Sequence, residues 1–357
     1  EDINYLRKQN KFSEEFLNYL ENFRFTGDVW AIPEGTVVFP NEPLITVRAP
    51  IIQAQLLETM LLLTTNHQSL IATKTSRIVK EAQGRPVMEF GARRAHGINA
   101  AVEGARAAII GGAIGTSCTL SAKEFNVPAS GTMAHSWVQS FDSEYEAFKT
   151  YAEIYPDDCT LLIDTYNTIE SGLPNAIKVF NEVLKPKGYK PKAVRLDSGD
   201  LAYLSKKVRK ILDEAGYTEC KICATNSLDE YLIKSLIEQD AKIDSFGVGE
   251  NLITAKSEPV FGGVYKLVGI EKDTKIIPKI KVSENVVKVT NPGFKKVYRF
   301  YDNESQKAIA DVIALSDEII DEREYMIFDP QNPWKKKLIK DYTIRAVSYT
   351  HLRAHET

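Results

Sequence analysis

The spacing of apolar residues changes along the chain and divides it into parts. Between residues 51 and 80 apolar side chains recur around a helix, which Gly84-Arg85-Pro86 ends. Residues 1–30 predict a helix and a turn, and residues 29–49 predict short strands broken by prolines. From residue 86 to about residue 268, short apolar runs alternate with longer helical patterns. This alternation is typical of repeated βα units around a parallel sheet.

The middle part predicts seven strands and a possible closing strand. The strands are Val87–Phe90, Gly115–Leu120, Ala129–Met133, Thr160–Ile163, Ala193–Leu196, Lys221–Ala224 and Ser245–Val248, with Gly263–Val268 to close the series. The intervening helices are Asn99–Ile110, Ser143–Tyr155, Asn175–Lys185, Leu201–Ala215 and Asp229–Asp240. Such a series forms either a barrel or an open doubly wound sheet. We favour an irregular (β/α) barrel, because the sequence contains neither nucleotide-binding glycine fingerprint of the open type.

Beyond residue 272 the sequence again predicts strands, with Val286–Val289 followed by a hairpin of Val297–Tyr301 and Ala308–Val312. We expect this part to join residues 1–49 in a second, smaller α/β domain built from both chain ends. The expected divisions are therefore 1–49, 50–270 for the barrel, and 271–346. Residues 347–357 continue no upstream pattern and are expected to be a foreign tail outside the fold, which removes His351 and His355 from the candidate catalytic groups.

Composition narrows the class of protein. A formal net charge of -3 and a pI near 6.1 argue against a nucleic-acid partner. The sequence has no apolar run of membrane-spanning length and no signal peptide, and its four cysteines are scattered, so we expect a cytoplasmic protein without a membrane partner. Cys220 and Cys223 form a C-x-x-C pair, but no second pair or nearby histidine supports a zinc or redox site.

Polar and glycine-rich clusters follow the carboxyl ends of the predicted strands, the active face of a barrel. Arg93 and Arg94 follow the first strand, and two adjacent guanidiniums after a buried strand call for carboxylate or phosphate partners. Gly247 and Gly249 would let backbone amides approach an anion, although two glycines are a weak motif. The remaining clusters contain Asp164, Asp197, Ser198, Asp200, Asn226 and Ser227. Ser198, Asp200 and Ser227 are equally compatible with helix capping.

His135 lies among small, turn-forming residues in the stretch Ser130–Trp137. Gly131 is expected to supply backbone freedom, and Thr132 and Ser136 to offer hydroxyls and amides to an anion beside the imidazole. A reactive histidine would be set in this way. The alternative is an imidazole that satisfies a local hydrogen bond in a loop.

Several motifs together resemble the nicotinate phosphoribosyltransferase family. They are Glu89-Phe90-Gly91-Ala92-Arg93-Arg94-Ala95-His96-Gly97, Gly131-Thr132-Met133-Ala134-His135-Ser136, Arg195-Leu196-Asp197-Ser198-Gly199-Asp200-Leu201 and Gly262-Gly263-Val264-Tyr265-Lys266-Leu267, with Pro33–Pro43 upstream. The resemblance covers about residues 5–340 in family order. It implies an irregular α/β barrel, and an enzyme that makes nicotinate mononucleotide and pyrophosphate from nicotinate and phosphoribosyl pyrophosphate, coupled to ATP hydrolysis through a phosphohistidine.

By the same resemblance His135 is the phosphorylated residue, and Arg93 and Arg195 hold carboxylate and phosphate groups. Asp164 and Asp197 resemble the acids around the ribose and Mg²⁺. From the chemistry of the carboxylates we expect Asp197 and Asp200 to be the Mg²⁺ ligands. Asn226, Gly247 and Gly249 line the phosphoribosyl pocket. The resemblance also implies a homodimer with shared active sites. The family's N-terminal segment with a nicotinate-stacking tyrosine has no counterpart here, so we expect a fragment.

Two alternatives stay open at this point. A quinolinate or nicotinamide phosphoribosyltransferase would share the barrel and the phosphate site, but the quinolinate enzyme needs no phosphohistidine. A catalytically silent protein would bind phosphate ligands without turnover. Stimulation of the reaction by ATP would distinguish the nicotinate enzyme from the quinolinate enzyme. Any turnover would distinguish an enzyme from the silent binding protein.

Overall fold

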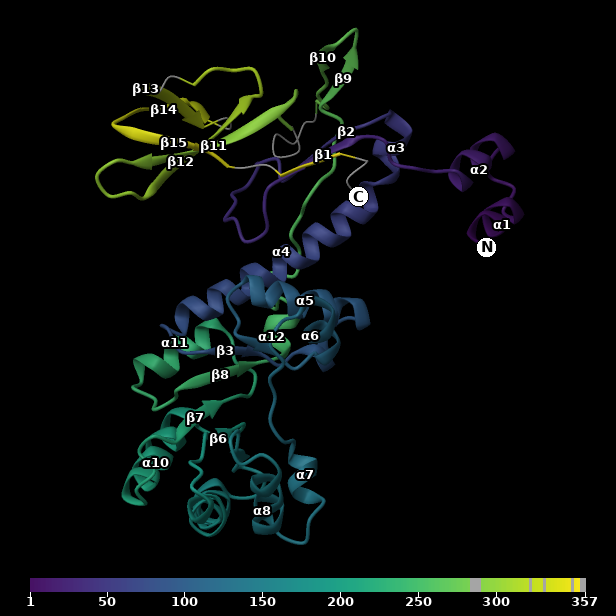
Figure 1. The fold of residues 1–357 in the computed structure, drawn as a ribbon. Coiled ribbons are helices and arrows are strands. Elements are labelled where there is room, and N and C mark those ends of the chain that lie inside the picture. Colours follow the sequence, from purple (N-terminus) through teal and green to yellow (C-terminus); the bar gives the residue numbers. More distant parts are fainter. Residues whose placement is uncertain (283–289, 321–322, 330–331, 348–349, 354–357) are drawn as a thin grey trace. The chain divides into compact units, whose positions relative to one another are not determined.

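The computed structural model describes residues 1–282, 290–320, 323–329, 332–347 and 350–353 (Figure 1). The chain forms two compact units, one of Glu1–Leu62 with Val264–Thr357 and the other of Leu63–Gly263. The smaller unit therefore draws on both chain ends, as expected. These divisions, after residues 62 and 263, differ from the expected ones after residues 49 and 270, and the first of the observed divisions falls within the long helix α4 (Glu58–Glu81).

The unit of Leu63–Gly263, here called the barrel unit, contains a six-stranded sheet in the order β4-β3-β8-β7-β6-β5. Its strands are β3 (Val87–Glu89), β4 (Gly115–Thr116), β5 (Thr160–Leu162), β6 (Ala193–Leu196), β7 (Lys221–Ala224) and β8 (Ser245–Val248). All neighbours are parallel. The first strand of the series, β3, pairs with the last, β8, whereas an open doubly wound sheet leaves its last strand at an edge. The expectation of an irregular barrel is confirmed.

Two of the predicted strands are much shorter than expected, β3 and β5 each end one residue early, and the predicted closing strand is not a strand. β4 ends at Thr116 because helix α6 begins at Thr119. The strand predicted at Ala129–Met133 is reduced to one parallel bridge between Ala129 and Thr116. Residues 263–268 form no strand, and β9 begins at Gly269. Beyond Ala129, Arg195 of β6 donates to Thr132 Oγ1 and to the Met133 carbonyl, so this segment bonds to a side chain and not to a neighbouring strand.

The predicted helices of the barrel unit are confirmed. The helical segments after α4 are η1 (Ala92–Arg94), α5 (Ile98–Ile110), α6 (Thr119–Phe125), α7 (His135–Gln139), α8 (Glu144–Ile154), η2 (Thr168–Gly172), α9 (Leu173–Val179), η3 (Phe180–Leu184), η4 (Lys185–Lys187), α10 (Leu201–Glu214), α11 (Glu230–Glu238) and α12 (Glu250–Ile253). Asp200 and Asp229 cap α10 and α11 by accepting hydrogen bonds from backbone amides three residues on. None of the described helices combines the length and the apolar character that crossing a membrane requires.

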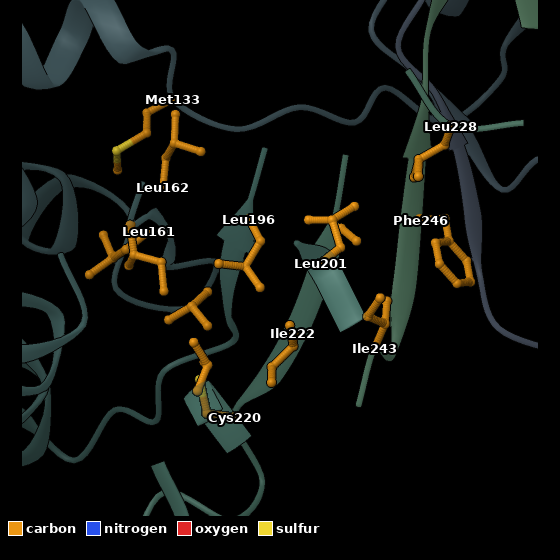
Figure 2. Packing of buried hydrophobic residues seen from close by; sticks show 14 of the residues in the cluster. Met133, Leu161, Leu162, Leu196, Leu201, Cys220, Ile222, Leu228, Ile243 and Phe246 are labelled. Atoms are coloured by element: carbon orange, nitrogen blue, oxygen red, sulfur yellow. The ribbon is translucent and has the colours of Figure 1, made fainter. Parts of the chain in front are cut away.

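The core of the barrel unit is made by the strands and the helices that cover them. Leu196, Ile222 and Phe246 come from β6, β7 and β8, and Leu201 of α10 lies beside them (Figure 2). Ile222 and Phe246 are completely buried. Each such side chain contributes about 1.5–3 kcal/mol by leaving water. This packing fixes the strand ends that carry the polar clusters.

Among its described residues the other unit forms four small antiparallel sheets, in the orders β16-β1-β2, β10-β9, β12-β11-β15 and β13-β14. Its elements are α1 (Asp2–Lys8), α2 (Glu14–Glu21), β1 (Asp28–Ala31), β2 (Ile45–Arg48), α3 (Ile51–Leu56), β9 (Gly269–Lys272), β10 (Lys275–Pro278), β11 (Lys295–Asp302), β12 (Ala308–Leu315), β13 (Glu324–Asp329), β14 (Asn332–Lys340), β15 (Tyr342–Ala346) and β16 (Thr350–Arg353). The predicted hairpin is β11–β12. Val286–Val289 lies outside the described residues.

Strand β16 differs from the expectation that residues 347–357 lie outside the fold. Its residues pair antiparallel with β1, from Thr350 opposite Ala31 to Arg353 opposite Asp28. The His351 ring stacks on Trp30 with ring centroids 4.5 Å apart. Pairing with an edge strand needs only backbone groups, so a segment without an apolar pattern can still add to a sheet. The foreign origin of the segment stays a prediction.

Candidate active site

The candidate site lies where β5 and β6 end, beside the start of α7. Asp164 follows β5, Asp197 follows β6, and His135 is the first residue of α7. Carboxyl ends of parallel strands meet at one edge of the sheet, so residues far apart in sequence converge there. The structure brings together His135, Asp164, Asp197 and Arg195, as the sequence predicts.

The His135 ring is held by contacts at both nitrogens. Nδ1 lies 3.2 Å from Thr165 Oγ1, and Nε2 lies 3.3 Å from Asp197 Oδ2 and 4.0 Å from Asp164 Oδ1. About 39% of its side chain is exposed, whereas that of Asp164 is 1% exposed. The imidazole therefore faces solvent on one side and two carboxylates on the other.

Arg195 and Asp197 form the central ion pair of the site. Arg195 Nη2 lies 3.0 Å from Asp197 Oδ1, while Nη1 donates to Thr132 Oγ1 at 2.7 Å and Nε to Thr225 Oγ1 at 2.9 Å. Burial opposes ionisation of Asp197, but hydrogen bonds from Thr225 and Arg195, the Arg195 charge and the His135 contact outweigh it. They hold the pKa of Asp197 below its ordinary value. Asp197 is consequently an anion at neutral pH.

Asp164 uses one oxygen to organise the loop after β6. Its Oδ2 accepts hydrogen bonds from the Asp197 amide at 2.8 Å and from Ser198 Oγ at 2.6 Å. Its Oδ1 is buried and receives no hydrogen bond from the described residues. Ser198 thus belongs to the site, and the cap of α10 is Asp200, whose Oδ1 accepts from the Tyr203 amide at 3.0 Å.

The two arginines of η1 are exposed and contact none of the groups around His135. Arg94 Nε lies 3.8 Å from Glu250 Oε2, an exposed pair of small energetic weight. Arg93 makes no ion pair within the described residues. Its guanidinium is therefore available to an external anion.

The glycines expected to cradle an anion have different local roles. Gly131 does not adopt a positive φ, so the expected backbone freedom is not used. A Cβ on Gly247 would lie 2.5 Å from the Phe90 ring and 2.7 Å from Thr225 Cγ2, so this glycine allows close packing within the sheet. Gly249 precedes α12, and a Cβ there would lie 3.1 Å from the Phe90 carbonyl oxygen.

The loop after β7 is held by a hydrogen bond from a side chain of α12. Asn226 is exposed, with φ 91°, and the next residue, Ser227, has φ 47°. The buried Asn251 side chain donates to the Ser227 carbonyl at 2.7 Å. Ser227 does not cap α11, since Asp229 does.

Ser136, which was expected to bind an anion beside His135, is exposed in α7.

The sequence led us to expect the Thr132 hydroxyl beside His135, but not the roles of the Thr165 and Thr225 hydroxyls, which also connect the charged groups. Thr132, Thr165 and Thr225 each donate or accept a hydrogen bond within the cluster. Sequence reasoning also missed the buried Glu89. Thr225 directly follows β7 and Thr165 lies three residues after the end of β5, which was a usable signal, but a threonine near a strand end is common in any sheet.

The site offers few protein ligands to a metal ion. Within the described ranges no group of three or more His, Cys, Asp or Glu residues has metal-binding geometry. Asp200 is occupied as a helix cap. One or two carboxylates suffice where Mg²⁺ is also held by substrate phosphates, and Asp164 and Asp197 fit that requirement, since Asp164 Oδ1 receives no hydrogen bond from the described residues.

Family models match almost the whole chain. The nicotinate phosphoribosyltransferase N-terminal domain matches residues 1–66, the nicotinate phosphoribosyltransferase family model matches residues 86–309, and the C-terminal domain matches residues 294–354.

Individual proteins give the same result. A nicotinate phosphoribosyltransferase of Bacillus subtilis is 48% identical over 342 residues, 96% of this chain and 69% of the relative. One of Mycobacterium tuberculosis is 48% identical over 301 residues, 84% of this chain and 62% of the relative. The chain thus spans between three fifths and seven tenths of these two proteins.

Two solved structures resemble the fold. Human nicotinic acid phosphoribosyltransferase matches with a TM-score of 0.84 at 24% identity, over 99% of this chain and 78% of that one. A nicotinate-nucleotide pyrophosphorylase of Pyrococcus furiosus matches with a TM-score of 0.67 at 27% identity, over 93% and 78%.

Proposed function

Because the chain belongs to the nicotinate phosphoribosyltransferase family, we propose that the whole protein joins nicotinate to phosphoribosyl pyrophosphate. The products are nicotinate mononucleotide and pyrophosphate, an entry into NAD by salvage. The observation that carries the proposal is the cluster of His135, Asp164, Asp197 and Arg195 at the ends of β5 and β6.

In the proposed reaction the nicotinate ring nitrogen forms a bond to the anomeric carbon as the bond from that carbon to the pyrophosphate oxygen breaks. The transition state has oxocarbenium character, so positive charge grows on the ribose. The ionised Asp197 and the adjacent Asp164 would stabilise that charge. Arg195, already oriented by Thr132 and Thr225, and the exposed Arg93 would hold the anionic groups of the substrates.

We infer that His135 accepts the γ-phosphoryl group of ATP. Nε2 faces two carboxylates, so the ring proton belongs on Nε2 and Nδ1 keeps its lone pair. The Nδ1–phosphorus bond would form as the bond from phosphorus to the ADP oxygen breaks, and the exposed side of the ring gives ATP access. Hydrolysis of the phosphohistidine would reset the site.

Mg²⁺ bound with the diphosphate would neutralise charge on the leaving group, with Asp197 and Asp164 as its protein ligands. Asp197 also orients Arg195, so the same carboxylate would link metal and guanidinium. By family membership we further expect a cytoplasmic homodimer with shared sites.

One assay tests the proposal. Full-length protein is incubated with nicotinate, phosphoribosyl pyrophosphate and Mg²⁺, with and without ATP, and nicotinate mononucleotide and pyrophosphate are measured. We expect both products, formed faster with ATP. Binding of phosphoribosyl pyrophosphate without product would instead support a silent binding protein.

The likeness to the Pyrococcus furiosus pyrophosphorylase favours a second candidate, a related pyridine phosphoribosyltransferase that does not use ATP. Quinolinate and nicotinamide replace nicotinate in the same assay. Turnover of quinolinate without any ATP effect would favour this candidate.

A further inference from the structure

Glu89 is a buried carboxyl group that the proposed chemistry does not use. It is the last residue of β3, lies opposite Thr116 of β4 and Val248 of β8, and is 0% exposed. No cation among the described residues pairs with it. Burial raises its pKa, and hydrogen bonds from Thr116 and Gly91 oppose that shift. Burying a carboxyl group without a cation costs free energy, so we ask what the hydrogen bonds of Glu89 contribute.

Both carboxyl oxygens of Glu89 hold loops at the candidate active face. Oε1 accepts a hydrogen bond from the Gly91 amide, the residue before η1. Oε2 accepts from Thr116 Oγ1 at 2.6 Å, and that hydroxyl accepts from the Cys118 amide at 2.9 Å. One side chain therefore joins the turn that carries Arg93 to the turn after β4.

Gly91 transmits this restraint to Arg93. A Cβ on Gly91 would lie 2.6 Å from Ile253 Cβ and 2.7 Å from the Gly249 carbonyl oxygen, so its backbone has no free space on that side. The Arg94 amide donates to the Gly91 carbonyl at 2.7 Å, which closes the turn around Arg93. The exposed Arg93 side chain thus starts from a backbone fixed on one side by packing and on the other by Glu89.

We propose that Glu89, with Thr116, is a positioning residue that fixes the Arg93 turn for an anionic substrate. The inference rests on the proposed function, because Arg93 is the group that meets the substrate. The residue would act through Arg93 and would not touch the substrate itself.

The test is a double-mutant cycle with Thr116→Val, Arg93→Ala and the combined variant in the full-length protein. Arg93→Ala identifies which substrate loses affinity. Thr116→Val should raise the KM of that same substrate by at least about fivefold with kcat changed less than twofold, and should add nothing further once Arg93 is absent. Glu89→Gln, which keeps an oxygen for the Gly91 amide, should give a smaller KM effect.

Thr75→Val is the matched control, because Thr75 is equally buried in α4 and donates its hydroxyl to the Ile71 carbonyl at 2.8 Å. It removes the same atom and should leave both KM values unchanged. Additive effects of Thr116→Val and Arg93→Ala, or equal KM values in Thr116→Val and Thr75→Val, would overturn the proposal. The same cycle is measured by calorimetry, with nicotinate and inorganic pyrophosphate as ligands. Absence of turnover would then contradict the proposed function, whereas the binding affinities would still decide whether Glu89 and Thr116 position Arg93.

Discussion

Replacing Asp197 by asparagine should weaken both the barrel unit and its chemistry. The side chain is 25% exposed and its partner Arg195 is 15% exposed, so the Asn variant leaves a largely buried guanidinium without its anion. Losing a charged hydrogen-bond partner in such a place costs about 2 kcal/mol. For a unit of this size that corresponds to a melting temperature lower by about 4–8 °C. The oxocarbenium ion also loses an anion, so kcat should fall at least about tenfold, or about 1.4 kcal/mol.

The effect of Asp197→Asn on the melting temperature should also depend on pH. The folded state holds the pKa of Asp197 below its ordinary value, so the stability from this shift is present at neutral pH and lost as pH falls through the folded pKa. The difference in melting temperature between wild type and Asp197→Asn should therefore shrink in strong acid.

Asp213→Asn is the matched control for Asp197→Asn. Asp213 pairs with Arg209 of α10, which is 19% exposed and also donates to the Cys220 and Tyr217 carbonyls. Asp213 itself is 46% exposed, so solvent screens its charge, and its loss should cost about 0.5 kcal/mol or less and leave kcat unchanged. Melting is followed by calorimetry, and turnover by nicotinate mononucleotide formation. If Asp197→Asn matched Asp213→Asn in both measurements, Asp197 would be an ordinary loop residue and the reasoning would fail.

Three further predictions use other parts of the chain. ATP should label the protein with an acid-labile, base-stable phosphate, and His135→Ala should abolish the label and the ATP stimulation while a slow ATP-independent reaction remains; a label that persists in the variant contradicts this. Burial and a hydrogen bond with Asp311 raise the pKa of Glu42 to about 7, so stability should fall as pH rises from about 4.5 to 7. Glu42→Gln should flatten that slope in calorimetric melting, and an unaltered slope would exclude Glu42 as its source. Truncation after Val347 should uncover Trp30 and change its fluorescence, measured against a Trp30→Phe variant; unchanged spectra and melting would show that β16 does not pair.

The sequence predicted the parts of the fold that depend on local patterns. The parallel strands such as Ala193–Leu196 and the helices between them follow from apolar runs and amphipathic spacing, and the structure confirms them. The strand expected at Ala129–Met133 was wrong for most of its length. Beyond Ala129 this segment is held by Arg195, which donates to Thr132 Oγ1 and the Met133 carbonyl. The Arg195 guanidinium comes from a strand that is distant in the sequence, so no local pattern around residues 129–133 predicts this contact.

The sequence predicted that some of the site residues lie together, but it did not predict the network between them. Asp164 and Asp197 were expected because they follow strands, and they do lie beside His135. The different roles of Ser198 and Asp200 could not be predicted from the sequence, because both residue types can cap a helix. In the structure only Asp200 caps α10, and Ser198 donates to Asp164. The packing role of Gly247 depends on the Phe90 ring, which only the β3–β8 pairing brings near.

The pairing of β3 with β8 also sets an order for assembly. His135, Asp164 and Asp197 come from α7 and from the ends of β5 and β6, all of which precede β8 in the chain. The Arg93 turn is fixed only when β8, at the far end of the series, has been made and joins β3. Closing so long a loop is entropically slow compared with forming neighbouring βα units. During synthesis the His135 cluster with its Arg195–Asp197 ion pair would therefore be made before the Arg93 turn is fixed, and a chain interrupted before Ser245 would have that cluster without the turn that meets the substrate.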